Sequence, residues 1–350
     1  MSARTHLLEV EDLNVSFDTD EGTVRAVDGV SFFLGAGEIL CLVGESGSGK
    51  SVMTSSLIGL TRAENASFSG SAHFDGVELI RASERVLERI RGAQIAFIPQ
   101  DPMTALDPVL RVGEQIAEQI RAHRAVSRRE AAQRAVALME RVGIPQARTR
   151  ARAFVHEFSG GMRQRIMIAM ALSCDPRLLI ADEPTTALDV TIQAQILHDL
   201  ADLCRETGAA LILVTHDFGI VAEFADRVAV MYGGRIVEQA TVTELFDDPQ
   251  HPYTWGLLGS VPRVDRPRSA RLPTIAGAPP SLVRPPVGCH FAPRCPHRFE
   301  QCVEVPPLAS RLPDQPDHRD RCWLDVAEKR RRRLVHGEIR LAGDGDRAVA

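Results

Sequence analysis

Short apolar runs alternate with helix-forming stretches from residue 7 to about residue 260. Three of these runs, Ile39–Val43, Leu178–Ala181 and Leu211–Thr215, have the length and the continuous apolar character of buried strands. A loop separates the first run from a helix that we expect to begin near Lys50. Strands that alternate with helices in this way form a largely parallel sheet, so the pattern predicts an α/β domain.

The pattern changes in two places. Residues 113–142 are predominantly helical in pattern, with an amphipathic stretch over Arg128–Val142, and they predict a helical subdomain. After residue 260 prolines are dense as far as Pro286, which disfavours regular structure. A compact module with four cysteines is expected to follow, over about residues 287–325.

Composition and charge indicate where in the cell the chain acts and which kinds of partner it has. The 350 residues carry a net charge of −5, which gives no reason to expect a nucleic-acid partner. No apolar run approaches the ~18 residues of a membrane span, and the first residues lack the apolar core of a signal peptide. We therefore expect a soluble cytosolic chain that reaches a membrane only through partners. The basic run Lys329–Arg333 fits either a solvated helix face or a contact with anionic lipid headgroups or a membrane subunit.

A phosphate-binding loop follows the first predicted strand, where the sequence matches the pattern G-x-x-x-x-G-K-S. Backbone N–H groups can surround a triphosphate only where the chain wraps closely, which glycine permits, and the start of the next helix adds a favourable dipole. The lysine would reach the β- and γ-phosphates, and the last serine would ligate Mg²⁺. The loop consists of Gly44, Glu45, Ser46, Gly47, Ser48, Gly49, Lys50 and Ser51.

Two carboxylates follow the strand predicted over Leu178–Ala181. Asp182, at the strand's end, would hold Mg²⁺ through water, and Glu183 would polarise the attacking water as a general base. Acids often follow buried strands, so this signal depends on the phosphate-binding loop that precedes it in the chain.

The segment Phe158–Arg165 reads Phe-Ser-Gly-Gly-Met-Arg-Gln-Arg and, with the two motifs above, resembles the ATP-binding cassette (ABC) family. It is similar to the signature sequence of that family, with Phe158 and Met162 in place of the more usual Leu and Gln. The resemblance implies that the Ser159, Gly160 and Gly161 core caps a γ-phosphate held by a second ATPase subunit. On its own, Ser159 would also read as an ordinary helix N-cap.

Other landmarks of the family follow in the expected order. Gln100 resembles the loop glutamine that contacts Mg²⁺ and water, and Ala187-Leu188-Asp189 resembles the loop that crosses the dimer interface. His216 resembles the switch histidine at the γ-phosphate. Phe17 is the candidate for the aromatic ring that stacks on adenine, with a core strand phenylalanine as the alternative.

The resemblance covers residues 7 to about 250 and implies a P-loop NTPase of the ABC type. Its parts are a RecA-like core, an antiparallel β subdomain and a helical subdomain, followed here by a small C-terminal cysteine-rich module. The predicted divisions are 1–260 for the nucleotide-binding domain, 261–335 for the extension and 336–350 for a tail.

The segments His251–Leu258, Ser260–Arg263 and Gly288–Pro296 resemble the cassettes of oligopeptide and dipeptide importers. The resemblance implies an ATPase that drives peptide uptake at the cytoplasmic face of the cell membrane. Its partners would be a second, non-identical ATPase subunit, two permease subunits and, indirectly, an extracytoplasmic peptide-binding protein. Importers of nickel or another small solute share this extension and remain an alternative.

Cassette proteins of translation or DNA repair form a competing class. Those of translation carry two cassettes in one chain, and those of repair insert a long coiled coil, neither of which is present in this sequence. A redox sensor with a vestigial ATPase site would be expected to lack Glu183 or His216, and both are present.

Four cysteines lie in the last quarter of the chain with the spacing C-x5-C-x6-C-x19-C. A small proline-rich module needs a stabilising cross-link in order to fold, and a reducing compartment disfavours disulfides. Four thiolates therefore suggest a metal centre. The resemblance to peptide importers implies a [4Fe–4S] cluster on Cys289, Cys295, Cys302 and Cys322. Structural Zn²⁺ and unligated thiols are the alternatives. Three nearby histidines are expected on the surface of the module, with the replacement of one cysteine ligand as the alternative, namely His290, His297 and His318.

Overall fold

Two sheets organise the chain, which the computed structural model describes over residues 6–101, 105–185, 189–261 and 274–335. The larger sheet has eight strands in the order β11-β12-β10-β9-β3-β8-β7-β6, and its core from β9 to β6 is parallel. These strands are β3 (Ile39–Val43), β6 (Ile95–Ile98), β7 (Leu178–Asp182), β8 (Ala210–Thr215), β9 (Arg227–Tyr232), β10 (Arg235–Thr241), β11 (Ala309–Ser310) and β12 (Arg319–Asp320).

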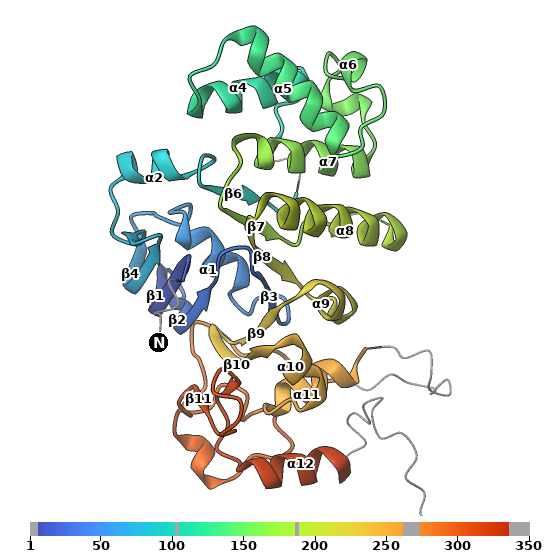
Figure 1. Cartoon of the computed structure of the whole chain (residues 1–350). Helices are drawn as coiled ribbons and strands as arrows, with labels where there is room; N and C mark the ends of the chain where they lie inside the picture. The colour runs from blue at the N-terminus through green and yellow to red at the C-terminus, as the bar shows by residue number, and fades with distance from the viewer. Residues whose placement is uncertain (1–5, 102–104, 186–188, 262–273, 336–350) are drawn as a thin grey trace, which may run out of the picture.

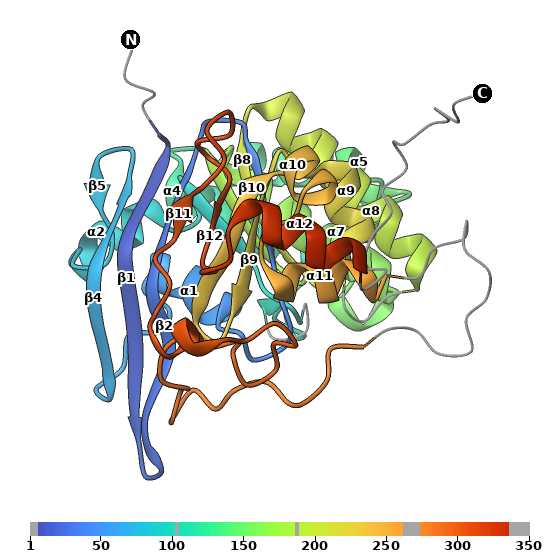
Figure 2. The ribbon, with the colours of Figure 1, turned by 90° about the horizontal axis from the view of Figure 1, so that it is seen from below.

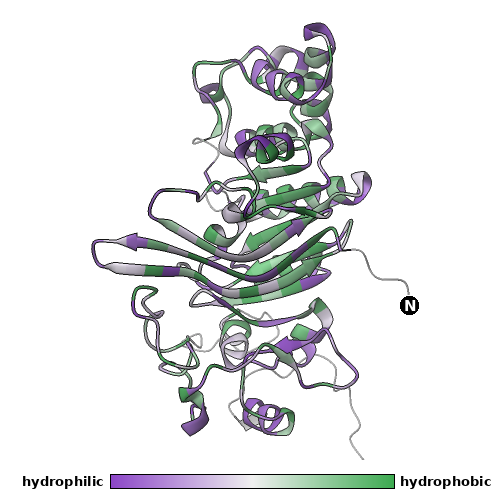
Figure 3. Ribbon diagram, turned by 90° about the vertical axis from the view of Figure 1, so that its left-hand side faces the viewer, coloured by the Kyte–Doolittle hydropathy of each residue, from purple (hydrophilic) through white to green (hydrophobic). Residues whose placement is uncertain are grey.

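The three strands predicted from apolar runs are confirmed as β3, β7 and β8, and every residue in them is buried. They are buried because helices cover one face of the sheet, while a helix and the second, smaller sheet cover the other, so no polar face is needed. Figure 3 shows these strands as an apolar band, whereas the helices at both ends of the molecule carry hydrophilic residues.

The smaller sheet is antiparallel, with four strands in the order β2-β1-β4-β5. Figures 1 and 2 show it on the flank of the main sheet, next to α1. Apolar side chains of both sheets pack into one cluster that includes Val15, Leu40 and Met53. Its strands are β1 (Leu8–Thr19), β2 (Gly22–Leu34), β4 (Ala66–Phe74) and β5 (Val77–Glu78).

The helical subdomain predicted over residues 113–142 forms α4 (Val112–His123) and α5 (Arg128–Arg141). It stands at the end of the molecule opposite the C-terminal segment (Figure 1). Ser127 caps α5 by accepting a hydrogen bond from the N–H of Glu130. Further α-helices in the described residues of the ATPase part are α1 (Lys50–Leu57), α2 (Glu84–Ile90), α6 (Ala147–Arg150), α7 (Gly160–Ala171), α8 (Val190–Thr207), α9 (Phe218–Phe224), α10 (Val242–Asp247) and α11 (Pro252–Gly259).

The segment after residue 273 wraps back along the ATPase part. Residues 274–286 contain neither helix nor strand, as their prolines predict. Further on, β12 pairs with β10 through Glu238 opposite Asp320 and Gln239 opposite Arg319, which extends the main sheet. The last helix, α12 (Val326–Val335), lies across α10 and α11 when the molecule is seen from below (Figure 2).

Candidate functional site

The loop between β3 and α1 makes close backbone approaches that only glycine allows. A Cβ atom on Gly44 would lie 2.1 Å from the carbonyl oxygen of Met231, and one on Gly49 would lie 2.1 Å from that of Ala26. Both glycines also have positive φ angles, 150° and 100°. The loop therefore lies directly against β2 and β9 and leads into the first turn of α1 at Lys50.

A pocket of about 410 Å³ opens over this loop. It brings together residues from β1, β2, the loop, α1, the end of β6, the end of β7 and the C-terminal segment. Its lining consists of Phe17, Val24, Ala26, Ser46, Gly47, Ser48, Gly49, Lys50, Ser51, Val52, Gln100, Glu183 and Leu282.

Lys50 and Asp182 are buried beside this pocket. Lys50 Nζ donates to the carbonyl oxygens of Gly44 and Glu45, at 2.8 and 3.0 Å. Burial lowers the pKa of Lys50, against the opposing effect of Glu183, Asp182 and Glu45. Ser51 Oγ donates to Asp182 Oδ1 at 3.0 Å, and burial raises the pKa of Asp182 despite that hydrogen bond. A cation, a hydroxyl and a carboxylate thus converge at the start of α1.

Three predicted catalytic side chains meet at the end of β7. Gln100 Nε2 donates to Glu183 Oε2 at 3.3 Å, and His216 Nδ1 lies 3.7 Å from the same oxygen. The backbone of Glu183 has a left-handed φ of 44°, and its N–H donates to the carbonyl oxygen of Val214 on β8. Since parallel strands end at one edge of the sheet, residues distant in sequence come together here.

The signature residues are placed elsewhere. Ser159 caps α7 by accepting from the N–H of Met162, and Ser159 and Gly160 are exposed. A Cβ atom on Gly161 would meet Ile192 of α8 at 3.0 Å. Asp189 is exposed at the start of α8, whereas Ala187 and Leu188 lie outside the described residues. None of these residues lines the pocket over the phosphate-binding loop.

The chain matches two protein-family profiles. Residues 27–186 match the profile described as ABC transporter, and residues 237–302 match that of the oligopeptide/dipeptide transporter C-terminal region. The oligopeptide transport ATP-binding protein OppD of Salmonella typhimurium is 52% identical, over 88% of this chain and 91% of the relative. The dipeptide transport ATP-binding protein DppD of Bacillus subtilis is 51% identical, over 91% of this chain and 94% of the relative.

The chain belongs to the ABC transporter ATP-binding protein family. Solved structures of such cassettes are also similar. The dimeric ATP-binding cassette MJ0796, in a post-hydrolysis state bound to ADP and Pi, matches with a TM-score of 0.60 and 26% identity, over 67% of this chain and 98% of that one. CbiO1 of Clostridium perfringens, part of the transporter complex CbiONQ, matches with a TM-score of 0.59 and 29% identity, over 69% of this chain and 90% of that one. The predicted ABC-type fold is therefore confirmed.

Two contacts of this cassette with its C-terminal part were not predicted from the sequence. Leu282 lines the pocket over the phosphate-binding loop, and the N–H of Arg25 on β2 donates to its carbonyl oxygen. Arg294 pairs with Glu45 of the phosphate-binding loop. No local pattern signals either contact, because both join residues about 250 positions apart.

All four cysteines of the C-terminal segment line one small hollow, together with Phe291, Phe299 and Trp323. Among the described residues, no group of three or more His, Cys, Asp or Glu side chains has the geometry to hold a single metal ion. The cysteine-rich metal module expected from the sequence is therefore not established by the fold or by the family matches.

The prediction that three histidines lie on the surface of this segment is wrong, because all three are buried. His290 Nδ1 lies 2.8 Å from the carbonyl oxygen of Gly233, and His318 Nε2 lies 2.8 Å from Glu238 Oε1. The ring of His297 packs edge-on against Trp255. Each histidine therefore joins the C-terminal segment to the cassette.

The basic run at 329–333 is paired with an acid of the cassette and with acids of the C-terminal segment itself. Lys329 is buried against Asp320, and Arg330 and Arg333 both pair with Asp248. Arg331 and Arg332 pair with Glu328 one turn earlier in α12. The run is thus part of a helix that docks on the cassette, and Arg330 and Arg331 keep 53% and 71% of their side chains accessible.

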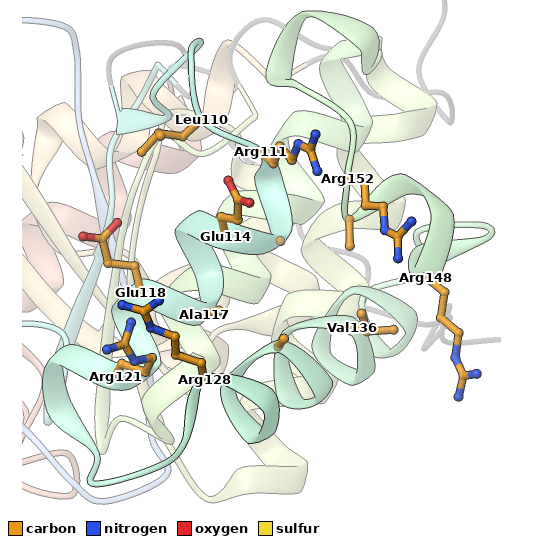
Figure 4. A pocket seen from close by; sticks show the side chains of 13 residues that line it. Leu110, Arg111, Glu114, Ala117, Glu118, Arg121, Arg128, Val136, Arg148 and Arg152 are labelled. Atoms are coloured by element: carbon orange, nitrogen blue, oxygen red, sulfur yellow. The ribbon is translucent and has the colours of Figure 1, made fainter.

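A second pocket, of about 750 Å³, lies within the helical subdomain (Figure 4). Glu114, Glu118 and Arg121 of α4 face it, and Arg128 and Arg148 contribute further charge from α5 and α6. None of the site residues predicted from the sequence lines it.

No helix in the described parts of the chain has the length and apolar character to cross a membrane.

Proposed function

We propose that this cassette binds and hydrolyses ATP and couples hydrolysis to the import of dipeptides or oligopeptides. The observation that carries the proposal is the pocket over the phosphate-binding loop, where Phe17, Lys50, Ser51, Gln100 and Glu183 face one space. Phe17 offers an aromatic face at one part of the lining for the adenine, and the loop offers backbone N–H groups and a cation for the phosphates.

Each of these side chains has a role that fits its placement. Lys50 would bind the β- and γ-phosphates, and the oxygens of Ser51, Asp182 and Gln100 are the hard ligands that Mg²⁺ prefers. When bound, Mg²⁺ neutralises charge on the phosphates. Glu183 would accept a proton from the attacking water, and His216, close to the same carboxylate, would contact the γ-phosphate.

The second half of the site would come from another subunit. Ser159, Gly160, Gly161 and Asp189 lie outside the pocket of their own chain and are exposed or half-buried, as residues that serve a sister cassette must be. A serine hydroxyl and glycine amides at a helix start are suited to bind an anion. We expect the sister subunit to be a non-identical relative.

The peptide substrate rests on the match of residues 237–302 to the oligopeptide/dipeptide transporter C-terminal region and on the names of the relatives. Such a transporter also requires two permease subunits and a peptide-binding protein on the far side of the membrane. We place the cassette at the cytoplasmic face of the membrane, held there by the permeases.

The test is transport by the complete complex in sealed vesicles, with the binding protein and labelled dipeptide supplied outside and ATP supplied at the cassette. Peptide should accumulate only with ATP, and a complex with Lys50→Ala should neither bind ATP nor transport. Hydrolysis without peptide uptake, with accumulation of ⁶³Ni²⁺ instead, would refute the peptide assignment and leave the ATPase assignment standing.

We also propose that Cys289, Cys295, Cys302 and Cys322 hold a [4Fe–4S] cluster. The support is the convergence of the four thiols on one hollow with aromatic walls. A cluster takes one thiolate on each of four irons, so its sulfur ligands stand wider apart than those of a single zinc ion. Protein purified without oxygen should be brown, with broad absorbance near ~400 nm and about four irons per chain. Colourless protein that contains zinc would overturn this assignment.

A further inference from the structure

The C-terminal segment reaches the phosphate-binding loop through Arg294, which directly precedes Cys295. Its Nη1 and Nη2 atoms donate to Oε2 and Oε1 of Glu45, at 2.6 and 3.1 Å. The Arg294 side chain is only 5% exposed, and that of Glu45 is 29% exposed. This is a bidentate, largely desolvated ion pair, a kind of contact that fixes orientation as well as distance.

The other N–H groups of Arg294 are also engaged. Nε donates to the carbonyl oxygen of Ala276 at 2.9 Å, and Nη2 also donates to that of Ile275 at 3.2 Å. Nη1 also lies 3.4 Å from the hydroxyl of Tyr232, which is the last residue of β9. The guanidinium is thus held rigidly by the C-terminal segment and the sheet before it meets the loop.

Glu45 is held at its backbone as well. Its N–H donates to the hydroxyl of Tyr253 on α11 at 2.9 Å, and its carbonyl oxygen accepts from Lys50 Nζ at 3.0 Å. One residue of the loop is therefore fixed at its side chain, its N–H and its C=O. The last of these contacts reaches the lysine expected to bind the phosphates.

We propose that Arg294 is a positioning residue for ATP binding, acting through Glu45 on the phosphate-binding loop and on Lys50. The inference rests on the proposed function. Arg294 acts in two ways: it orients the peptide group that holds Lys50, and it balances the charge of a carboxylate that would otherwise repel a triphosphate. The C-terminal segment then contributes directly to ATP binding, through the position of the loop and of Lys50.

The test compares Arg294→Met with wild-type protein in the full chain, by calorimetric titration with ATP and by turnover in the assembled complex. Removing one partner of a buried bidentate pair should weaken ATP binding about tenfold and raise KM by a similar factor. The kcat at saturating ATP should stay within about twofold, because Arg294 does not touch the reacting atoms.

Arg333→Met is the matched control. Arg333 also belongs to the C-terminal segment, is 11% exposed and pairs with an acid of the cassette, Asp248, at 2.9 Å. It does not contact the loop, so its loss should leave ATP affinity at the wild-type value. Equal losses of affinity in the two variants would overturn the inference, because they would show general loosening of the segment.

Two further variants test the mechanism. Glu45→Gln added to Arg294→Met removes the unbalanced charge and should recover part of the lost affinity, whereas a further loss of affinity would contradict the charge argument. Arg294→Lys keeps the charge but not the bidentate geometry, so it should give an intermediate affinity, and it carries the test if Arg294→Met does not fold. Unchanged ATP affinity in the Arg294 variants would refute the inference, whereas wild-type protein unable to bind ATP would refute the proposed function itself.

Discussion

At the scale of single residues, Glu183 combines an unfavourable backbone with a carboxylate held at the pocket. A left-handed φ of 44° costs a residue other than glycine about 1–3 kcal/mol and persists only where its surroundings enforce it. Here the hydrogen bond to Val214 and the contacts of the carboxylate with Gln100 and His216 do so. The carboxylate is therefore positioned before any water arrives, as a general base requires.

Glu183→Gln should preserve the packing at the end of β7 but remove the carboxylate that is proposed to act as the general base. We expect phosphate release to fall at least ~100-fold, because proton transfer to a positioned base contributes 10²–10⁴ to such rates. ATP affinity should remain, since Lys50 and the loop are untouched. Glu206→Gln is the control, because Glu206 pairs with Arg141 on the surface. Full hydrolysis by Glu183→Gln would remove Glu183 from its role.

Leu282 supports a second prediction at this scale, because it lines the pocket proposed to bind ATP, together with Phe17. Leu282→Ala should weaken ATP binding roughly fivefold to tenfold, since a lost apolar contact in a binding pocket is worth about 1–1.4 kcal/mol. Val283→Ala provides the control, because Val283 packs towards Gly22 and does not line the pocket. Calorimetric titration with ATP that gave the same affinity for both variants would contradict this role.

At the scale of elements, two buried ion pairs hold the C-terminal segment together and against β10. His318, which precedes β12, pairs with Glu238 of β10, and both side chains are fully buried. Lys329 of α12 pairs with Asp320 of β12, and both are buried as well. Removing one partner of a buried ion pair is strongly destabilising, because the other charge is left unpaired. The His318–Glu238 pair therefore favours one register of β12 on β10, and the Lys329–Asp320 pair holds α12 against β12.

The His318–Glu238 pair should make stability depend on pH. Burial lowers the pKa of His318, but the hydrogen bond and charge of Glu238 prevail and leave the pKa above its usual value of 6.5. A raised pKa in the folded state means that the pair's contribution is complete below pH 6.5 and is lost as the pH rises through the folded pKa. Burial raises the pKa of Glu238, yet His318 holds it below 4.5, so the carboxylate stays charged over this range.

His318→Gln should therefore lower the Tm by several degrees at pH 6, since breaking a buried pair costs about 3–5 kcal/mol. The difference in Tm between His318→Gln and wild-type protein should become smaller towards pH 9, as measured by thermal unfolding followed by circular dichroism. His198→Gln is the control, because His198 pairs with Glu223 in an exposed position. A difference in Tm that stays constant from pH 6 to pH 9 would show that protonation of His318 contributes nothing to stability.

The sequence predicted elements well where a local pattern carries the information. Continuous apolar runs identified β3, β7 and β8, and the glycines before Lys50 identified the loop. The placement of the C-terminal segment had no such signal. Strands as short as β11 and β12 have no periodicity, and the burial of His318 depends on an acid 80 positions away. Contacts over that distance are set by tertiary packing, which a single sequence does not reveal.

At the scale of the whole molecule, the expected site residues divide into two groups. Those of the loop, the β6–β7 edge and β1 surround one pocket, whereas the signature residues lie apart from it on α7. The resemblance to the family had already assigned the signature residues to the site of a second subunit, and their distance from the pocket is compatible with that expectation. The signature residues do not line the pocket of their own chain, and this separation is the observation behind the proposed pairing of two cassettes.

The pairing should depend on Ser159. In the Glu183→Gln background, ATP should hold this chain and its sister cassette in a closed dimer, because binding without hydrolysis removes the step that reopens it. Adding Ser159→Arg should abolish that dimer in light scattering, since a bulky cation would stand where the hydroxyl meets the sister's nucleotide. Ser127→Arg is the control: Ser127 caps α5 as Ser159 caps α7, and both are exposed. If capping alone mattered, both substitutions would act alike. A dimer that survives Ser159→Arg, or that forms without ATP, would mean that the signature does not complete the site.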